Sequence, residues 1–129
     1  MRQEIRAPGL HEPISHYTDA VRFGNLLFIS GCGPLDEHLN LVGGDDVVEQ
    51  TRQVFRNLEK ILRAAGATFA DVLKVTVYLT NIDDRAKINP VRQEFFGSAR
   101  PASTLIEVSR LAVPGMKVEI EAVAGLPTP

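Results

Sequence analysis

Cysteine, tryptophan and net positive charge are scarce in this chain of 129 residues. Cys32 is the single cysteine, and there is no tryptophan. One cysteine excludes an internal disulfide and argues against a cysteine-based structural zinc site. Lys and Arg number 14 against 16 Asp and Glu, which gives a formal net charge of -2. We therefore expect no nucleic-acid partner, because the basic surface that such a partner requires is missing.

Long apolar runs are also missing. No run approaches the length that crosses a membrane, and the first residues, Met1-Arg2-Gln3-Glu4, do not form a signal peptide. The three histidines, His11, His16 and His38, lack the spacing of metal ligands, so no metal site is expected. We therefore expect a cytoplasmic protein without a membrane partner. A chain of this length with 44% hydrophobic residues is expected to fold as one domain over residues 1–129.

Alternation of apolar and polar residues predicts a sheet. Gly24-Asn25 is a tight-turn signal that joins two strands as a hairpin, and residues 1–15 are expected to form a short edge strand or a loop. The strands are expected at residues 17–23, 26–30, 72–80, 102–108 and 117–124. In the strand at 72–80, the residues expected to face the core are Leu73, Val75, Val77 and Leu79.

Two helices are expected between these strands. Asp46 and Glu49 form a capping-box pattern that opens the first helix, and Gly66 ends it. Its apolar stripe is expected to run through Val48, Phe55, Leu58, Ile61, Leu62 and Ala65, with only Arg52 interrupting it. Pro90 cannot donate a hydrogen bond inside a helix, so the second helix is expected in two pieces, the later one capped by Asn89 and ended by Gly97. This order indicates an α+β fold in which two helices cover one face of a mixed sheet and an oligomer buries the other.

The strand at 117–124 carries two carboxylates on one face. Glu119 and Glu121 share that face with Lys117 and Val123, and the residues between them point to the opposite face. On spacing alone, Glu119 is better explained as an interface carboxylate paired with Lys117 or Lys74 than as a catalytic group. If an oligomer leaves Glu119 in a partly dry cleft, however, the carboxylate is suited to act as a base.

Ordered matches to a known family run over residues 17–124. They lie at residues 17, 20–21, 24–31, 34–36, 49–54, 57–58, 64–67, 75–80, 95–96, 101–102, 110–111 and 118–122. By these segments the chain resembles the reactive intermediate deaminase family, RidA, also called YjgF. The resemblance implies a chorismate-mutase-like fold and a homotrimer that binds a small molecule in clefts between neighbouring subunits. It also implies hydrolysis of enamines or imines to ketones and ammonia without a cofactor.

The resemblance assigns roles to individual residues. The water-activating carboxylate falls on Glu119, the cleft tyrosine on Tyr17 and the pocket asparagine on Asn89. Ser30 and Gly31 match the serine and glycine that follow the buried strand, and backbone N–H groups near Gly31 are expected to hold the substrate's polar end. Tyr17 taken alone is more often a half-buried packing residue than a catalytic one.

The segment after Pro101 departs from the family pattern. Deaminating members carry arginine where this chain has Ser103, and many carry cysteine where it has Leu105. A serine supplies neither the charge nor the two-pronged geometry that holds a carboxylate, so imines derived from amino acids are expected to bind poorly. Arg100 and Arg110 are the nearby cations that could compensate, although Arg110 matches a common family arginine that has no role in the pocket. Ser103, Leu105 and Cys32 are nevertheless expected to line the substrate pocket. Cys32 is better explained there as a small buried thiol than as a nucleophile.

Two classes of function remain open from the sequence. The first is an enzyme that hydrolyses an imine, an enamine or a related C–N bond in a small metabolite that lacks, or does not present, an α-carboxylate. The second is a non-catalytic trimer that binds a small ligand or a partner protein through the same clefts, with Glu119 as a hydrogen-bond acceptor. Release of ammonia from a panel of imines distinguishes the two.

Overall fold

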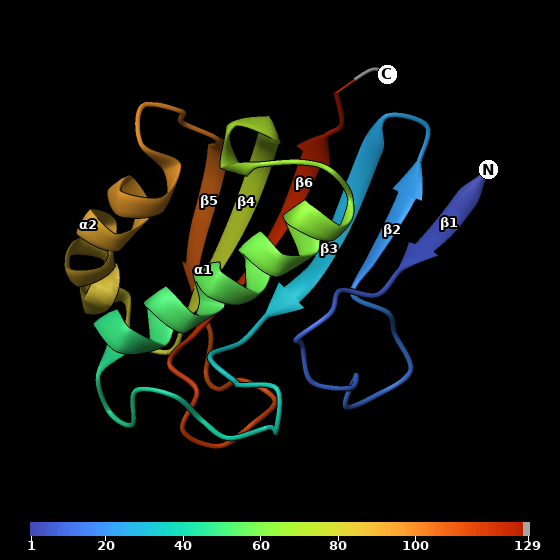
Figure 1. Cartoon of the computed structure of the whole chain (residues 1–129). Helices are drawn as coiled ribbons and strands as arrows, with labels where there is room; N and C mark the ends of the chain where they lie inside the picture. The colour runs from blue at the N-terminus through green and yellow to red at the C-terminus, as the bar shows by residue number, and fades with distance from the viewer. Residues whose placement is uncertain (128–129) are drawn as a thin grey trace.

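The computed structural model describes residues 1–127, which form a six-stranded mixed sheet packed against helices (Figure 1). The last two residues of the domain expected at 1–129 lie outside this described part. The strands are β1 (Arg2–Ile5), β2 (Ala20–Phe23), β3 (Leu26–Cys32), β4 (Val72–Leu79), β5 (Ala102–Glu107) and β6 (Val118–Gly125). The helices are α1 (Val47–Ala64) and α2 (Arg85–Phe96), and short 3-10 turns precede β4 and α2 at Phe69–Asp71 and Ile82–Asp84.

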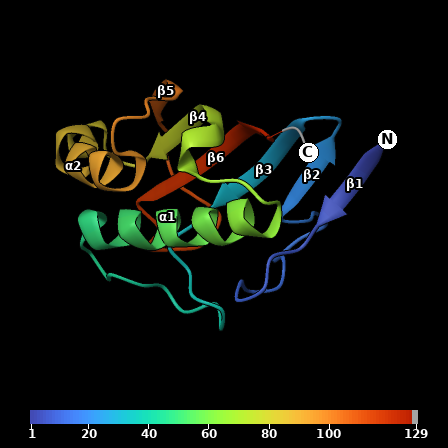
Figure 2. The same ribbon diagram turned by 45° about the horizontal axis from the view of Figure 1, so that its top comes forward.

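The last strand of the chain lies inside the sheet. The strand order is β1-β2-β3-β6-β4-β5, in which β4 and β5 are parallel and the other neighbours are antiparallel. The helix α2 makes the crossover that a parallel pair requires. Figures 1 and 2 show α1 lying across the sheet, with α2 beside it near β5. The expected mixed sheet with two helices is confirmed, and the segment 1–15 contributes the edge strand β1.

The start of α1 confirms one half of the predicted capping box. The Asp46 side chain accepts hydrogen bonds from the backbone N–H groups of Val48, at 2.9 Å, and Glu49, at 3.4 Å. The Glu49 carboxylate pairs with Arg52 at 2.6 Å, and the Asp46 N–H donates to the Gly43 carbonyl. Gly66, with a φ of 77°, follows the end of the helix as predicted.

The predicted apolar stripe of α1 lies against the core, but the helix also buries polar side chains that the stripe did not include. Gln50, Thr51, Gln53 and Asn57 are buried, whereas Val48 and Arg52 are half-buried. The Gln50 amide donates to the carbonyls of Gly44, at 2.7 Å, and Gly115, at 2.9 Å. Internal hydrogen bonds of this kind let a polar residue occupy a position that a hydrophobic pattern assigns to solvent.

The predicted core face of β4 is wrong at Leu73. The register between β4 and β6 shifts between Val72 and Lys74, so Val72 takes a buried position and Leu73 is 52% exposed. The other three residues of the predicted set are buried. A bulge of one residue is enough to reverse the alternation of side chains at that point.

The predicted interruption of the second helix at Asn89 is also wrong. The helix α2 runs without a break through Pro90, and the preceding 3-10 turn ends at Asp84. Ile88 and Val91, on either side of the proline, are both buried. Their packing offsets the one backbone hydrogen bond that Pro90 cannot donate.

The sheet face opposite the helices is semi-polar. The strand registers place Tyr78 opposite Glu119, Thr76 opposite Glu121, and Lys74 and Phe28 opposite Val123. We call the face defined by these seven residues the open face. A hollow of about 240 Å³ lies on it, and Phe28 is 47% exposed there. Within residues 1–127, no helix combines the length and the apolar character needed to cross a membrane.

Candidate functional site

Four of the predicted site residues line one hollow of about 320 Å³ beside β3 and β6. We call it the Glu119 hollow, and its lining includes Ile14, Tyr17, Ser30, Gly31, Ala112 and Glu119. The bend after Ile29 in β3 and the loop of residues 6–19 therefore meet the carboxylate of β6. The resemblance predicted this grouping, and the structure brings these residues together in one chain.

Glu119 lies directly over Gly31. A Cβ atom at position 31 would lie 2.9 Å from Cδ of Glu119, so any larger residue there would force the carboxylate to move. Partial burial, and then the negative charge of Glu121, raise the pKa of Glu119 above its usual value. A carboxylate of this kind accepts a proton more readily than an exposed glutamate does.

The ion pair that spacing favoured for Glu119 is not formed within the described chain. Among residues 1–127 no lysine or arginine pairs with Glu119, and Lys74 instead donates to the Thr104 hydroxyl at 2.9 Å. The carboxylate is therefore half-buried without a compensating cation. This environment is typical of carboxylates that take part in proton transfer.

The pairing of β3 with β6 is irregular at Gly31. The register of β3 with β6 runs from Leu26 to Ile29 and resumes only at Cys32. Ser30 and Gly31 therefore fall in a bulge, beside the Glu119 hollow. Bulges often direct backbone groups toward a site, which fits the expectation that Gly31 helps to hold a ligand.

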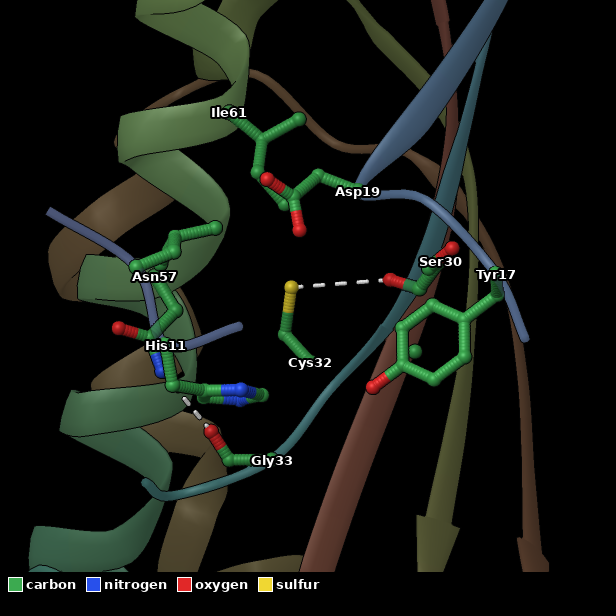
Figure 3. Close-up of a pocket in the computed structure, with 10 residues that line it drawn as sticks. His11, Tyr17, Asp19, Ser30, Cys32, Gly33, Asn57 and Ile61 are labelled. Carbon is green, nitrogen blue, oxygen red and sulfur yellow. Dashed lines mark hydrogen bonds between the residues drawn. The ribbon is translucent and has the colours of Figure 1, made fainter. Parts of the chain in front are cut away.

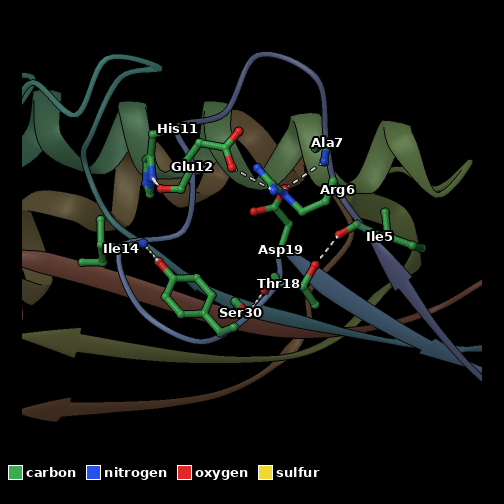
Figure 4. A network of polar contacts seen from close by, with 10 residues as sticks. Ile5, Arg6, Ala7, His11, Glu12, Ile14, Thr18, Asp19 and Ser30 are labelled. Carbon is green, nitrogen blue, oxygen red and sulfur yellow. Dashed lines mark hydrogen bonds and ion pairs between the residues drawn. The ribbon is translucent and has the colours of Figure 1, made fainter.

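Ser30 has a structural contact that the sequence did not predict. Its hydroxyl donates to the Thr18 carbonyl at 2.6 Å, and its backbone N–H donates to the Asp19 carbonyl at 3.0 Å. The buried Asp19 carboxylate accepts from Arg6 Nε at 3.1 Å and from the Ala7 N–H at 2.8 Å (Figure 4). Ser30 thus fixes the wall of the hollow, and its hydroxyl proton is already engaged.

Tyr17 lies where a hydrogen-bonding group can reach a ligand. Its ring is 43% exposed, and its hydroxyl oxygen accepts a hydrogen bond from the Ile14 N–H at 3.3 Å (Figure 4). Because the oxygen is the acceptor in this contact, the phenolic proton can be donated to a ligand in the Glu119 hollow.

Cys32 is a buried structural thiol. It lines a separate cavity of about 30 Å³ with Asn57 and Ile61 of α1, and its thiol donates to the Ser30 carbonyl at 3.6 Å (Figure 3). Burial, and then the charges of Asp19 and Glu119, raise the pKa of the thiol to about 12. The thiol stays protonated near neutral pH and is a poor nucleophile, as the sequence analysis favoured.

Asn57 positions the loop after β3, and the sequence analysis did not identify it as a site residue. Its amide donates to the carbonyls of Gly33, at 3.0 Å, and Leu35, at 2.8 Å, and its oxygen accepts from Gln53 at 3.0 Å. Asn57 is polar and follows the exposed Arg56 on the helix, so the sequence suggests a solvent-exposed side chain. Its place in the matched segment 57–58 was the only sign in the sequence that it differs from an ordinary surface residue.

Two further predicted residues, Asn89 and Ser103, lie in a second hollow, of about 280 Å³, between α2 and the start of β5. We call it the Arg92 hollow, and its lining includes Asn89, Arg92, Gln93, Arg100, Pro101 and Ser103. Leu105 is half-buried and packs against the core. Arg92, which the sequence analysis missed, donates from its guanidinium to the Ser103 hydroxyl at 2.9 Å.

The two hollows lie on opposite sides of the sheet. Ser103 is paired with the buried Val75, so its side chain points toward the helices, whereas Glu119 is paired with Tyr78 on the open face. One copy of the chain therefore does not bring Ser103 and Asn89 to Glu119. A site that uses both hollows needs two copies. Residues 1–127 also hold no cluster of three or more His, Cys, Asp or Glu arranged to bind a metal.

Comparisons with known proteins agree with the resemblance. The family model described as endoribonuclease L-PSP matches residues 6–126. A RutC family protein of Pyrococcus horikoshii is 44% identical over 124 residues, which cover 96% of this chain and 98% of that protein. A protein of Dermatophagoides farinae named 2-iminobutanoate/2-iminopropanoate deaminase is 33% identical over 119 residues, 92% of each chain.

Solved structures extend the likeness to the fold. The crystal structure of E. coli TdcF with bound serine is 31% identical, has a TM-score of 0.89, and matches over 97% of this chain and 99% of that chain. The family model covers nearly the whole described chain, and the relatives match over nearly their full length. The chain therefore belongs to the endoribonuclease L-PSP family, also known as the YjgF/RidA family.

Proposed function

We propose that this protein hydrolyses an imine or enamine to a carbonyl compound and ammonia, without a cofactor, with Glu119 as the general base. The observation that carries the proposal is the Glu119 carboxylate, which is half-buried over Gly31, has a raised pKa and pairs with no cation among residues 1–127. The relative from Dermatophagoides farinae, which is named as a deaminase of two imino acids, supports the same class of reaction.

The reaction needs one water and one proton acceptor. Water attacks the carbon of the protonated C=N bond, and Glu119 takes a proton from the water as the C–O bond forms. Glu119 then returns this proton to the nitrogen of the carbinolamine. Glu119, ionised again, takes the hydroxyl proton as the C–N bond breaks and the carbonyl forms, and this proton then passes to the departing ammonia, which leaves as ammonium. Tyr17 and the backbone at Gly31 are placed to hold the polar atoms of the intermediate.

The proposal includes a homotrimer with its sites between copies. The open face carries Phe28 and Val123 beside charged residues, and such a mixed surface is suited to a wet subunit interface. The separation of Ser103 and Asn89 from Glu119 within one copy is explained if a neighbouring copy supplies the missing half of each site. RNA cleavage is not supported, because a chain of net charge -2 offers little to a phosphate backbone.

Replacement of the base tests the proposal. We expect Glu119→Gln to keep the fold and the assembly while lowering the rate of ammonia release by about 100-fold or more, the usual contribution of a general base. The substrates are imines generated in the assay by oxidation of small amino acids and amines. Unchanged turnover in the variant would contradict the role of Glu119. If the native protein binds the product ketones but releases no ammonia, the protein is a binding module rather than an enzyme.

A further inference from the structure

Arg92 is held in place by a residue of another element. It extends from α2 toward the edge strand β5, where one of its terminal nitrogens donates to the Ser103 hydroxyl at 2.9 Å. A guanidinium has five N–H donors, and a serine oxygen accepts from only part of this fork. The half-buried Arg92 makes no other side-chain hydrogen bond within the described residues, and it lines a hollow of about 280 Å³. The side chain is therefore oriented and still has donors for a ligand.

The Arg92 hollow contains cations without a matching anion. Its lining includes a second arginine, Arg100, and no aspartate or glutamate from the described chain. Glu94, two residues after Arg92, pairs with Arg52 at 3.3 Å instead. The lack of a carboxylate partner sets Arg92 apart from the half-buried Arg52, which pairs with two glutamates. Desolvation without a compensating charge also lowers the pKa of Arg92.

A half-buried guanidinium favours a planar oxyanion that accepts two parallel hydrogen bonds. Asn89 and Gln93 add neutral amides to the same lining, so a small polar ligand finds both donors and acceptors there. Judged from the sequence, the family's arginine is absent at position 103, and Arg100 and Arg110 are the nearby substitutes. The structure places a different arginine, from the preceding helix, directly against Ser103.

We propose that Arg92, oriented by Ser103, binds the carboxylate of the substrate and so determines specificity for imines that carry one. The catalytic part of this inference rests on the proposed hydrolysis, whereas the binding part does not. Contrary to the expectation from Ser103 alone, imines derived from amino acids then become good substrates. Arg92 of one copy would hold the carboxylate while Glu119 of its neighbour activates water.

Binding of a product analogue tests the subsite without relying on turnover. The probes are 2-oxobutanoate and 2-oxobutanamide, which share a carbon skeleton and differ in the charge of the carboxyl group. We expect Arg92→Gln to weaken binding of 2-oxobutanoate by about 10- to 100-fold, as for loss of a charge-assisted pair, and to leave binding of the amide nearly unchanged. Arg92→Lys keeps the charge but loses the fork, so its loss should be smaller. Arg85→Gln removes an exposed arginine from the same helix and should bind as the native protein does.

The measurement is titration of each folded variant by calorimetry or NMR, together with KM and kcat on the imine of 2-aminobutanoate. Native-level binding of 2-oxobutanoate by either Arg92 variant contradicts the inference, as does equal binding of the acid and the amide by the native protein. If binding depends on Arg92 but no ammonia is released, the subsite stands and the proposed hydrolysis fails. If ammonia is released with the same KM in Arg92→Gln, the hydrolysis stands and the subsite fails.

Discussion

At the scale of single residues, Glu119 shows how neighbours set the properties of a carboxylate. Gly31 provides the space, partial burial removes part of its hydration, and Glu121 adds a like charge. The last two effects raise the pKa of Glu119, so it is a stronger proton acceptor than an exposed glutamate. A general base must be ionised before it acts, and the rate is therefore expected to fall as the pH drops through this raised pKa.

Glu121→Gln should move the acidic limb of the pH–rate profile to lower pH. Removing the negative charge next to Glu119 lowers the pKa of Glu119, so more of the enzyme carries an ionised base at a given acidic pH. The measurement is kcat/KM for ammonia release across the acidic range, for native and variant proteins of equal assembly state. A limb that stays in place, or moves to higher pH, would show that another group controls the acidic side.

Residues whose role follows from the local sequence pattern were predictable. Residues whose role depends on contacts between distant parts of the chain were not. Glu119 and Gly31 could be placed by the resemblance and by strand alternation. Arg92 could not, because its contact with Ser103 exists only once α2 has packed beside β5. The use of the Ser30 hydroxyl was also not predicted: Thr18 lies just beyond the Ala20–Ile29 pair of the β2–β3 hairpin, but strand alternation does not say which carbonyl a serine hydroxyl will meet.

At the scale of elements, α1 both covers the sheet and fixes neighbouring loops through buried polar side chains. Gln50 binds the loops at Gly44 and Gly115, and Asn57 binds the loop that follows β3. The start of α1 and the alternation of β6 were predictable, because caps and strand periodicity are local properties of the chain. The bulge at Leu73 and the unbroken helix at Pro90 were not, because both are decided by packing against other elements.

Asn57→Ala should destabilise the protein by about 3 kcal/mol, because it leaves the buried carbonyls of Gly33 and Leu35 without their donor. Arg56→Ala is the matched control on an exposed position of the same helix, and its effect should stay within about 0.5 kcal/mol. The measurement is the free energy of unfolding in urea. Equal stability of the two variants would mean that the Asn57 contacts contribute nothing to holding this loop.

At the scale of the whole molecule, the central question is whether two hollows on opposite sides of the sheet combine into one site between copies. The open face exposes Phe28, and it lies on the same side as Glu119. The Arg92 hollow lies on the helix side near the edge strand β5. In a cyclic trimer each copy can present its open face to the edge of the next, so every cleft would combine Glu119 of one copy with Arg92 of another.

Mixing two impaired variants tests this account most directly. Glu119→Gln and Arg92→Gln are each expected to be slow on the imine of 2-aminobutanoate when assayed alone. In trimers reassembled from equal amounts of both, about one quarter of the clefts should receive an intact Glu119 and an intact Arg92 from different copies. Ammonia release should then recover to about one quarter of the native rate. If mass spectrometry shows mixed trimers that are no more active than the separate variants, the shared-cleft mechanism is wrong.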